Sequence, residues 1–139
     1  MISYTTFTRG LSNGLKITWE LSKAVVPVYI LVTILKHTPV LPWLSEHMMP
    51  FMHIVGLPGE ASLPVVLGIF LNVYAAIGAI ASLNLSIKQI TVISAIIMVA
   101  HSLPVETAVS KKTGIRTAPL VMTRLLVGFG LGFFINVLL

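Results

Sequence analysis

The chain has 139 residues, of which 56% are hydrophobic and only 9% charged. Because soluble domains carry about 25% charged residues, this composition excludes an ordinary water-soluble domain and predicts an all-α integral membrane protein. At about 20 residues per helical span, residues 1–139 can form a single membrane domain of four to five hydrophobic helices. The chain has no cysteine, which excludes disulfides and zinc–thiolate sites.

Residues 1–23 predict the start of an amphipathic helix. One face carries an apolar stripe with a spacing of four residues, formed by Leu11, Leu15 and Trp19. The other face carries charges, at Lys16, Glu20 and Lys23. The following uncharged stretch, Ala24–Leu35, has twelve residues and is too short to cross a bilayer alone. We therefore expect one helix that begins in the membrane interface and then turns inward.

The next segment, residues 39–58, is apolar but interrupted by prolines. These are Pro39, Pro42, Pro50 and Pro58. Because each interior proline removes a backbone hydrogen bond, a continuous lipid-facing helix is unfavourable here, and a broken or re-entrant element inside the protein fits better.

His47 and His53 flank three methionines in this segment. Their spacing is not a known metal-ligand pattern, so no metal site is predicted, and a metal-ion permease component remains a weaker alternative.

Three longer apolar stretches follow. Leu63–Leu83 has twenty-one residues without a charge, and Gln89–Val105 has seventeen. Both are expected to be spans. The C-terminal stretch, residues 117–139, would span if Arg124 reaches the interface or finds a partner inside the protein. Its Gly128 and Gly132 are four residues apart, a spacing that lets helices approach closely within the chain or across a dimer interface.

The basic residues predict an orientation in the membrane. Nine Lys and Arg oppose four Glu, an excess that indicates contact with anionic lipid. Six of the nine fall into two groups: Arg9, Lys16, Lys23, and Lys111, Lys112, Arg116. The positive-inside rule then predicts a cytoplasmic N-terminus. Five crossings would leave the C-terminus outside, but this parity fails if the proline-rich segment only dips into the membrane. The basic residues are split among separate segments of the chain, so no nucleic acid partner is predicted.

A short pattern recurs in the sequence at an offset of 46 residues. Leu57-Pro58-Gly59-Glu60-Ala61 is matched by Leu103-Pro104-Val105-Glu106-Thr107, and Gly68-Ile69 by Gly114-Ile115. A chance match is the alternative. Each Leu-Pro-x-Glu can open a helix, with proline in the first turn and an acid near the positive end of the helix dipole.

The two acids of this repeat are candidates for substrate binding. Broken helices at membrane depth expose free backbone groups, and transporters use such helices at the substrate site. An acid near the hydrocarbon layer is costly unless it binds something. We therefore expect Glu60 and Glu106 to bind substrate or a coupling ion, with solvated interfacial caps as the alternative.

These stretches resemble the nucleoside-recognition or Gate family of membrane proteins. The resemblance covers residues 50–116 and rests on two segments, Gly56-Leu57-Pro58-Gly59-Glu60-Ala61-Ser62-Leu63-Pro64 and His101-Ser102-Leu103-Pro104-Val105-Glu106-Thr107-Ala108. The family includes small sporulation membrane proteins and ferrous-iron transporter gates, and it is related to concentrative nucleoside transporters. In those transporters a similar G-x-x-E-A-P-L pattern ends a re-entrant hairpin, and its Glu binds the nucleoside. This chain has one extra residue between Gly56 and Glu60.

The resemblance implies a multi-pass protein of the inner (cytoplasmic) membrane. It implies backbone breaks at Gly56, Pro58, Gly59 and Pro104. Because full nucleoside transporters and iron permeases carry two or more such units in a longer chain, it also implies a homodimer or a second Gate-like subunit as partner.

Four further polar residues lie in or beside the apolar stretches. These are Asn72, His101, Ser102 and Arg124. Each can contact substrate. The alternatives are a helix–helix hydrogen bond for Asn72 and a bond to a nearby carbonyl for His101. Arg124 can pair with Glu60 or Glu106, bind an anionic group, or snorkel.

Together these features predict a transporter, or a subunit of a transport complex, for a small polar solute that is nucleoside-like or an ion. The alternative is an accessory or structural subunit that assembles with a partner without moving solute. No nucleophile elbow and no metal-binding His pair is present, so an enzyme is not expected. No cofactor is predicted, and a coupling ion is left open.

Overall fold

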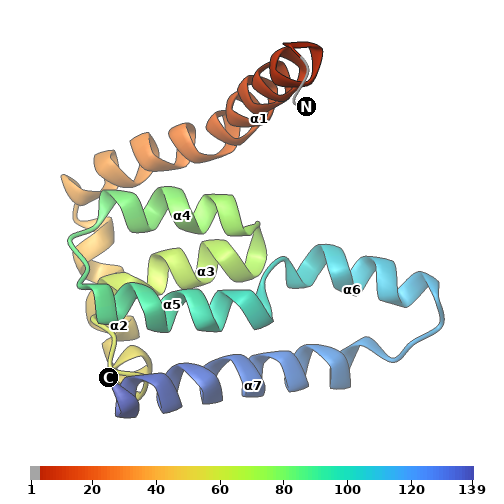
Figure 1. Cartoon of the computed structure of the whole chain (residues 1–139). Helices are drawn as coiled ribbons and strands as arrows, with labels where there is room; N and C mark the ends of the chain where they lie inside the picture. The colour runs from red at the N-terminus through yellow and green to blue at the C-terminus, as the bar shows by residue number, and fades with distance from the viewer. Residues whose placement is uncertain (1–3) are drawn as a thin grey trace.

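The computed structural model describes residues 4–139, which form seven α-helices and one 3₁₀ turn, with no strand in that range (Figure 1). The elements in chain order are α1 (Tyr4–Lys36), α2 (Val40–Ile54), η1 (Gly59–Ala61), α3 (Ser62–Phe70), α4 (Val73–Ser82), α5 (Ile87–Ala100), α6 (Leu103–Lys112) and α7 (Thr117–Leu138). The all-α prediction is confirmed.

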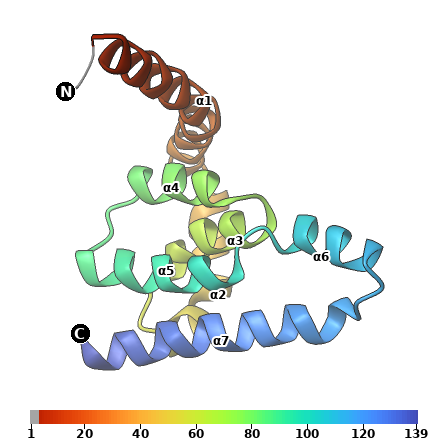
Figure 2. The same cartoon turned by 45° about the vertical axis from the view of Figure 1, so that its right-hand side comes forward.

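Five helical segments lie alongside one another in the order α1, α4, α3, α5 and α7, as Figure 1 shows from top to bottom. Helix α2 lies across one end of this layer, close to the C-terminus. Helix α6 extends beyond the opposite end, where the chain turns back into α7. Figure 2 shows the N-terminal half of α1 projecting away from the layer in a different direction from α6.

Three helical stretches among the described residues are long and apolar enough to cross a membrane. They are Thr5–Lys36, Ile87–Lys112, which contains α5 and α6, and Thr117–Leu138. Helix α2 and the η1–α3 segment would together form a fourth, but they are bent by 90° relative to each other. The expected broken or re-entrant segment is therefore present, although α2 itself continues through Pro50.

The bend after α2 follows from local backbone constraints. Gly56 has φ +71°, a left-handed conformation that glycine adopts at little cost. Pro58 then precedes η1 in an extended conformation. Gly59 packs directly against the backbone of Ser45, where a side chain would clash. The three breaks expected at Gly56, Pro58 and Gly59 thus form one sharp turn.

The expected continuous span Leu63–Leu83 is wrong. The chain breaks at Leu71 and Asn72, and α3 and α4 form a helical hairpin. The Asn72 side chain accepts a hydrogen bond from the Ala75 backbone N–H at 2.9 Å, which caps the start of α4. With 9 and 10 residues, each helix is about 15 Å long at 1.5 Å per residue, half of the hydrocarbon thickness.

The core lies between α3, α5 and α7 and depends on close helix packing. Gly128 and Gly132 of α7 face α5, and a Cβ atom at Gly132 would lie 2.7 Å from Ile96 Cγ1. Ile96 is fully buried. On the other side of the layer, a Cβ at Gly78 of α4 would lie 2.7 Å from the carbonyl oxygen of Val25 in α1. The glycine pair of α7 therefore packs helices within this chain.

Candidate functional site

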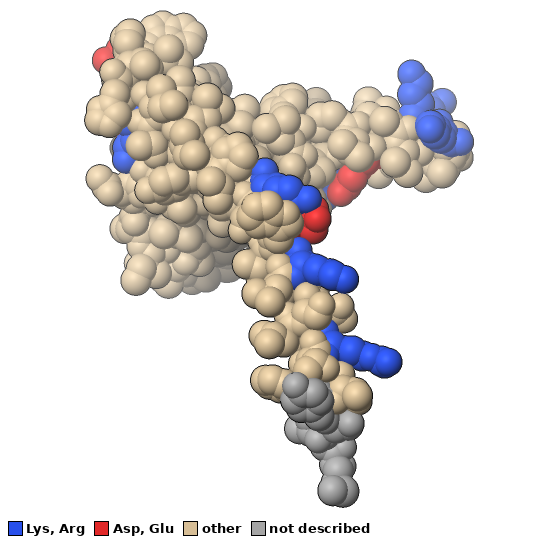
Figure 3. All heavy atoms as spheres, turned by 90° about the horizontal axis from the view of Figure 1, so that it is seen from above, with Lys and Arg blue, Asp and Glu red and all other residues tan. Residues whose placement is uncertain are grey.

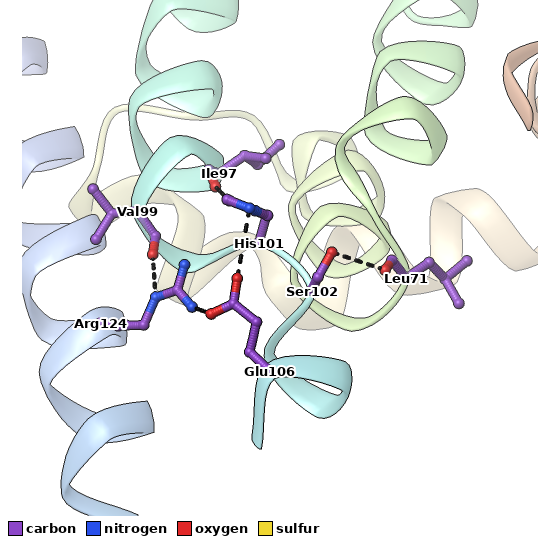
Figure 4. A network of polar contacts seen from close by, with 7 residues as sticks. All are labelled: Leu71, Ile97, Val99, His101, Ser102, Glu106 and Arg124. Atoms are coloured by element: carbon purple, nitrogen blue, oxygen red, sulfur yellow. Dashed lines mark hydrogen bonds and ion pairs between the residues drawn. The ribbon is translucent and has the colours of Figure 1, made fainter. Parts of the chain in front are cut away.

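The candidate site lies where two chain breaks meet. The α3–α4 turn contacts the break between α5 and α6 (Figure 4). The Ser102 backbone N–H donates to the Gly68 carbonyl at 3.0 Å, and the Ser102 hydroxyl donates to the Leu71 carbonyl at 3.2 Å. One serine therefore joins the broken helix to the tip of the hairpin.

The break between α5 and α6 has a local cause. Pro104 lies in the first turn of α6. Because proline has no backbone N–H to donate to the carbonyl of the preceding turn, α5 does not continue unbroken through it. His101 is extended at ψ 156°. Ser102 has φ +50°, in the left-handed region, which costs a non-glycine residue conformational energy. The expected break at Pro104 is thus two to three residues upstream of it, at His101–Ser102.

Glu106 is the centre of a polar network beside this break. One carboxylate oxygen forms an ion pair with an Arg124 terminal nitrogen. The other lies 3.7 Å from His101 Nε2. The Glu106 and Arg124 side chains are only 39% and 22% exposed, so both charges are partly removed from the surface. The network joins α6 to α7 and to the end of α5 (Figure 4).

Two members of this network also bond to carbonyl groups at the end of α5. Arg124 Nε donates to the Val99 carbonyl at 2.6 Å, and His101 Nδ1 lies 3.1 Å from the Ile97 carbonyl. The last four carbonyls of a helix have no partner within it, and a cation near them is favoured by the helix dipole. Arg124 thus satisfies the open end of α5 while pairing with Glu106.

Glu60 lies away from this network. It is half-buried and lines a cavity of about 220 Å³ with Lys36, Leu41, Pro42 and Ser45. This cavity is formed by residues of the end of α1, the first half of α2 and η1, whereas Glu106 follows α5 at the other end of the helical layer (Figures 1 and 2). Of the two alternatives for an acidic partner of Arg124, the structure has the pair with Glu106.

The two copies of the sequence repeat share only their first turn. Glu60 and Glu106 each lie in the first turn of a helical element that follows a break. Beyond that turn the copies diverge, because Gly68 is buried within α3 whereas Gly114 lies in the turn after α6 with φ +79°. A structural duplication is therefore not shown.

The histidines of α2 are not gathered into a cluster. His47 stacks on Trp43 with ring centroids 4.5 Å apart, and its Nδ1 lies 2.8 Å from the Trp43 carbonyl. His53 is exposed. Within residues 4–139, no three His, Asp or Glu side chains are arranged to hold a metal ion.

Sequence reasoning missed the backbone part of the site. The carbonyls of Gly68, Leu71 and Val99 bind Ser102 and Arg124, and a carbonyl carries no side-chain signature. An apolar cavity of about 290 Å³ beside α6 was also not foreseen. It is lined by Ile69, Phe70, Leu103, Pro104, Thr107, Val121 and Leu125.

Three long apolar helical stretches, one of them broken beside a polar network, and a helical hairpin define a multi-pass α-helical membrane protein. The family model described as "Gate: Nucleoside recognition" matches residues 18–116. The chain therefore belongs to the Gate family. It is also 42% identical over 119 residues to the uncharacterized membrane protein YvoD of Bacillus subtilis strain 168. That alignment covers 86% of this chain and 38% of YvoD, so the chain spans less than half the length of this relative. No solved structure matches the chain.

The family match contains most of the site but not all of it. His101, Ser102 and Glu106 lie within residues 18–116, whereas Arg124 lies outside them. Arg124 is nevertheless bonded to Glu106 and to the end of α5. The C-terminal helix thus completes the polar network of the Gate-like part.

Proposed function

We propose that the protein is a transporter, or a subunit of a transport complex, that moves a small polar solute across the inner (cytoplasmic) membrane. The single observation that carries this proposal is the meeting of a half-length hairpin and a broken helix beside a Glu–Arg–His network. Transporters bind solutes where discontinuous helices expose backbone groups at membrane depth.

Helix lengths support a location of this network within the hydrocarbon layer. Helix α5 has 14 residues before the break, about 21 Å at 1.5 Å per residue. Arg124 lies seven residues after Thr117, at which α7 begins, a distance of about 10 Å along the helix axis. The hydrocarbon core is about 30 Å thick. If α5 and α7 each begin at a membrane surface, the end of α5 and Arg124 therefore both lie well inside this core. A charged network at that depth is characteristic of substrate or ion pathways.

The basic residues support an orientation. The N-terminal half of α1 and the stretch from the end of α6 to the start of α7 contain six of the nine basic residues. Two crossings between them, by α1 and by α5–α6, would put both groups on one side of the membrane. The positive-inside rule assigns this side to the cytoplasm. Crossings by α1, α5–α6 and α7 then leave the C-terminus outside, with the α3–α4 hairpin entering from the outer face and returning to it.

In this proposal Glu106 is the principal solute contact. A solute with hydrogen-bond donors, such as a nucleoside-like molecule or a cation, can replace Arg124 or His101 as the partner of the carboxylate. Ser102 and Asn72 lie at the two breaks and offer further polar contacts. Glu60 lines a separate cavity with residues of the end of α1 and the first half of α2, where an entering solute can bind first.

One chain encloses only part of a solute pathway. We assign the remaining part to another copy of this chain or to a second Gate-like subunit. The described part of the chain has one hairpin and one broken helix. Large apolar residues of α4 are exposed, among them Tyr74 and Ile77. Apolar groups exposed on such a helix can face lipid or a partner helix.

An accessory role is the second candidate, and one observation favours it. Glu106, Arg124 and His101 already satisfy one another and the end of α5, so the network can serve purely to hold helices together. In that case the chain would position a partner in the membrane without binding solute.

Transport into proteoliposomes tests the proposal. The purified chain is reconstituted, and uptake of labelled nucleosides and of Fe²⁺ is compared for wild type, Glu106→Gln and Glu60→Gln. We expect Glu106→Gln to reduce uptake at least tenfold, and Glu60→Gln to raise the half-saturating concentration with a smaller effect on maximal rate. Glu20→Gln, which removes an exposed acid of α1, is the control and should transport as wild type.

The outcome separates the two candidates. If the Glu60→Gln/Glu106→Gln variant folds and transports every solute as well as wild type, the binding-site assignment is wrong. If wild type transports a solute only when a second Gate-like protein is present, the chain is a subunit of a complex.

A further inference from the structure

The N-terminal half of α1 leaves the helical layer and projects away from it. Every residue from 5 to 20 is exposed, whereas residues further along α1, such as Val28 and Val32, pack in the core. Figure 2 shows this part of α1 projecting away from the bundle. We call residues 4–23 the N-terminal arm. The proposed transport pathway makes no use of it.

The arm is longer than membrane crossing requires. Helix α1 has 33 residues, about 50 Å at 1.5 Å per residue, whereas the hydrocarbon core is about 30 Å thick. Roughly thirteen residues of helix therefore extend beyond the hydrocarbon if α1 crosses it. This excess accounts for about thirteen of the twenty residues of the arm, and the remaining residues lead from the interface into the hydrocarbon.

Charged and apolar side chains occupy different sides of the arm. At about 100° per residue, its four charges fall within an arc of about 60°, and they are Arg9, Lys16, Glu20 and Lys23. Figure 3 shows the basic side chains projecting from one side of the arm. The opposite side carries large apolar side chains, namely Phe7, Leu11, Leu15 and Trp19, with exposed fractions of 56% to 67%.

We propose that the arm binds along the membrane surface, with its apolar side in the lipid and its basic side chains on acidic phospholipid headgroups. Three observations support this partner. The arm continues directly into a membrane-spanning segment, which holds it at the surface. Glu20 is neutralised by Lys23 at 2.7 Å, so the charged side is net basic. Trp19 lies at the edge of the apolar side, and tryptophan is enriched at membrane interfaces.

A second copy of the arm is the competing occupant. Thr6, Gly10, Gly14 and Thr18 are spaced four residues apart, and neither glycine has an atom within 4 Å of its Cβ position. Such small residues allow close helix packing. They lie on the apolar side, however, and pairing through them would not use the basic side chains. Charge complementarity therefore favours acidic lipid.

The chain has no cysteine, so single spin labels can report on the arm in the complete protein. Leu15→Cys labels the apolar side and Asn13→Cys the opposite side. Each labelled protein is reconstituted in nanodiscs of phosphatidylcholine, with or without phosphatidylglycerol. Collision with dissolved oxygen reports lipid exposure, and collision with a water-soluble nickel chelate reports water exposure.

With phosphatidylglycerol present, we expect oxygen to reach the label at 15 and the nickel chelate to reach the label at 13. Replacing Arg9, Lys16 and Lys23 by Gln should lower the ratio of bound to free arm by about fivefold per residue. High salt should have the same direction of effect, because it screens exposed charges. Gln at Lys111, Lys112 and Arg116 removes the same charge elsewhere and should leave the label at 15 unchanged.

Two results would overturn the proposal. If the nickel chelate reaches both labels equally in acidic nanodiscs, the arm is in water. If labels on two copies show dipolar coupling that Gly10→Leu/Gly14→Leu abolishes, the partner is a second arm. The lipid proposal expects the opposite response to this double variant, namely tighter binding, because two apolar side chains are added to the lipid side.

Discussion

At the scale of single residues, Glu106 and Arg124 show why few charges can organise an apolar chain. Each has its partner, and Arg124 also binds the Val99 carbonyl at the open end of α5. In a low-dielectric environment an unpaired charge is costly. Removing one partner therefore leaves the other charge uncompensated. Sequence reasoning identified both residues and included their pairing among its alternatives. Only the folded chain selected it, because α7 lies against α5 and α6.

A double-mutant cycle on this pair tests its contribution to stability. Glu106→Gln and Arg124→Gln should each lower the free energy of unfolding by about 2 to 3 kcal/mol, and the double variant should cost less than the sum, since neither charge is then stranded. Thermal unfolding in detergent measures this. The exposed pair Lys23 and Glu20 is a matched control, with an expected coupling of at most about 0.5 kcal/mol. Equal coupling in the two pairs would contradict the structural role of the network.

At the scale of elements, a side-chain cap and a glycine–proline turn determine where helices end. Leu63–Leu83 has no charge, and hydropathy averages over a window, so it predicts one span. Asn72 breaks that span by capping α4 with its own side chain. Proline was the more visible signal, yet Pro50 lies inside the continuous helix α2 whereas the turn at Gly56 to Pro58 ends it.

The glycines of α7 give a matched test of helix packing. A Cβ at Gly132 would lie 2.7 Å from Ile96 Cγ1, whereas one at Gly130 has no atom within 4 Å. Gly132→Leu should therefore destabilise the fold by about 1 to 3 kcal/mol through overpacking. Gly130→Leu should be neutral or slightly stabilising, because leucine has the higher helix propensity. Thermal unfolding of both variants is the measurement, and equal shifts would mean that α7 does not pack against α5 through Gly132.

At the scale of the whole molecule, the number of membrane crossings determines on which side of the membrane each end of the chain lies. The expected five crossings compare with three helical stretches among residues 4–139 that are long enough to cross a membrane, or up to four if α2 and the η1–α3 segment form one bent span. In the proposed topology the α3–α4 hairpin enters and leaves from one face, so three crossings, like five, would put the two ends of the chain on opposite sides.

Cysteine labelling in intact cells tests this topology. Thr113→Cys lies in the α6–α7 connection and Leu138→Cys near the C-terminus. A membrane-impermeant maleimide should label position 138 from outside, and position 113 only after the membrane is permeabilised. The reverse pattern would invert the orientation, and labelling of both positions from outside would exclude a crossing by α7.

The sequence alone determined the class of this protein, because low charge and long apolar stretches leave a membrane as the only suitable solvent. It also determined the family and most of the polar candidates, since charges are rare enough to stand out. Only the tertiary structure decided which of them meet. Glu106, His101 and Arg124 come together because the break at Ser102 docks on the hairpin tip and α7 packs against α5 through glycine. Glu60 shares the motif but lies at the α2–η1 bend. Spacing along a chain sets local conformation, whereas the packing of distant helices sets which side chains become neighbours.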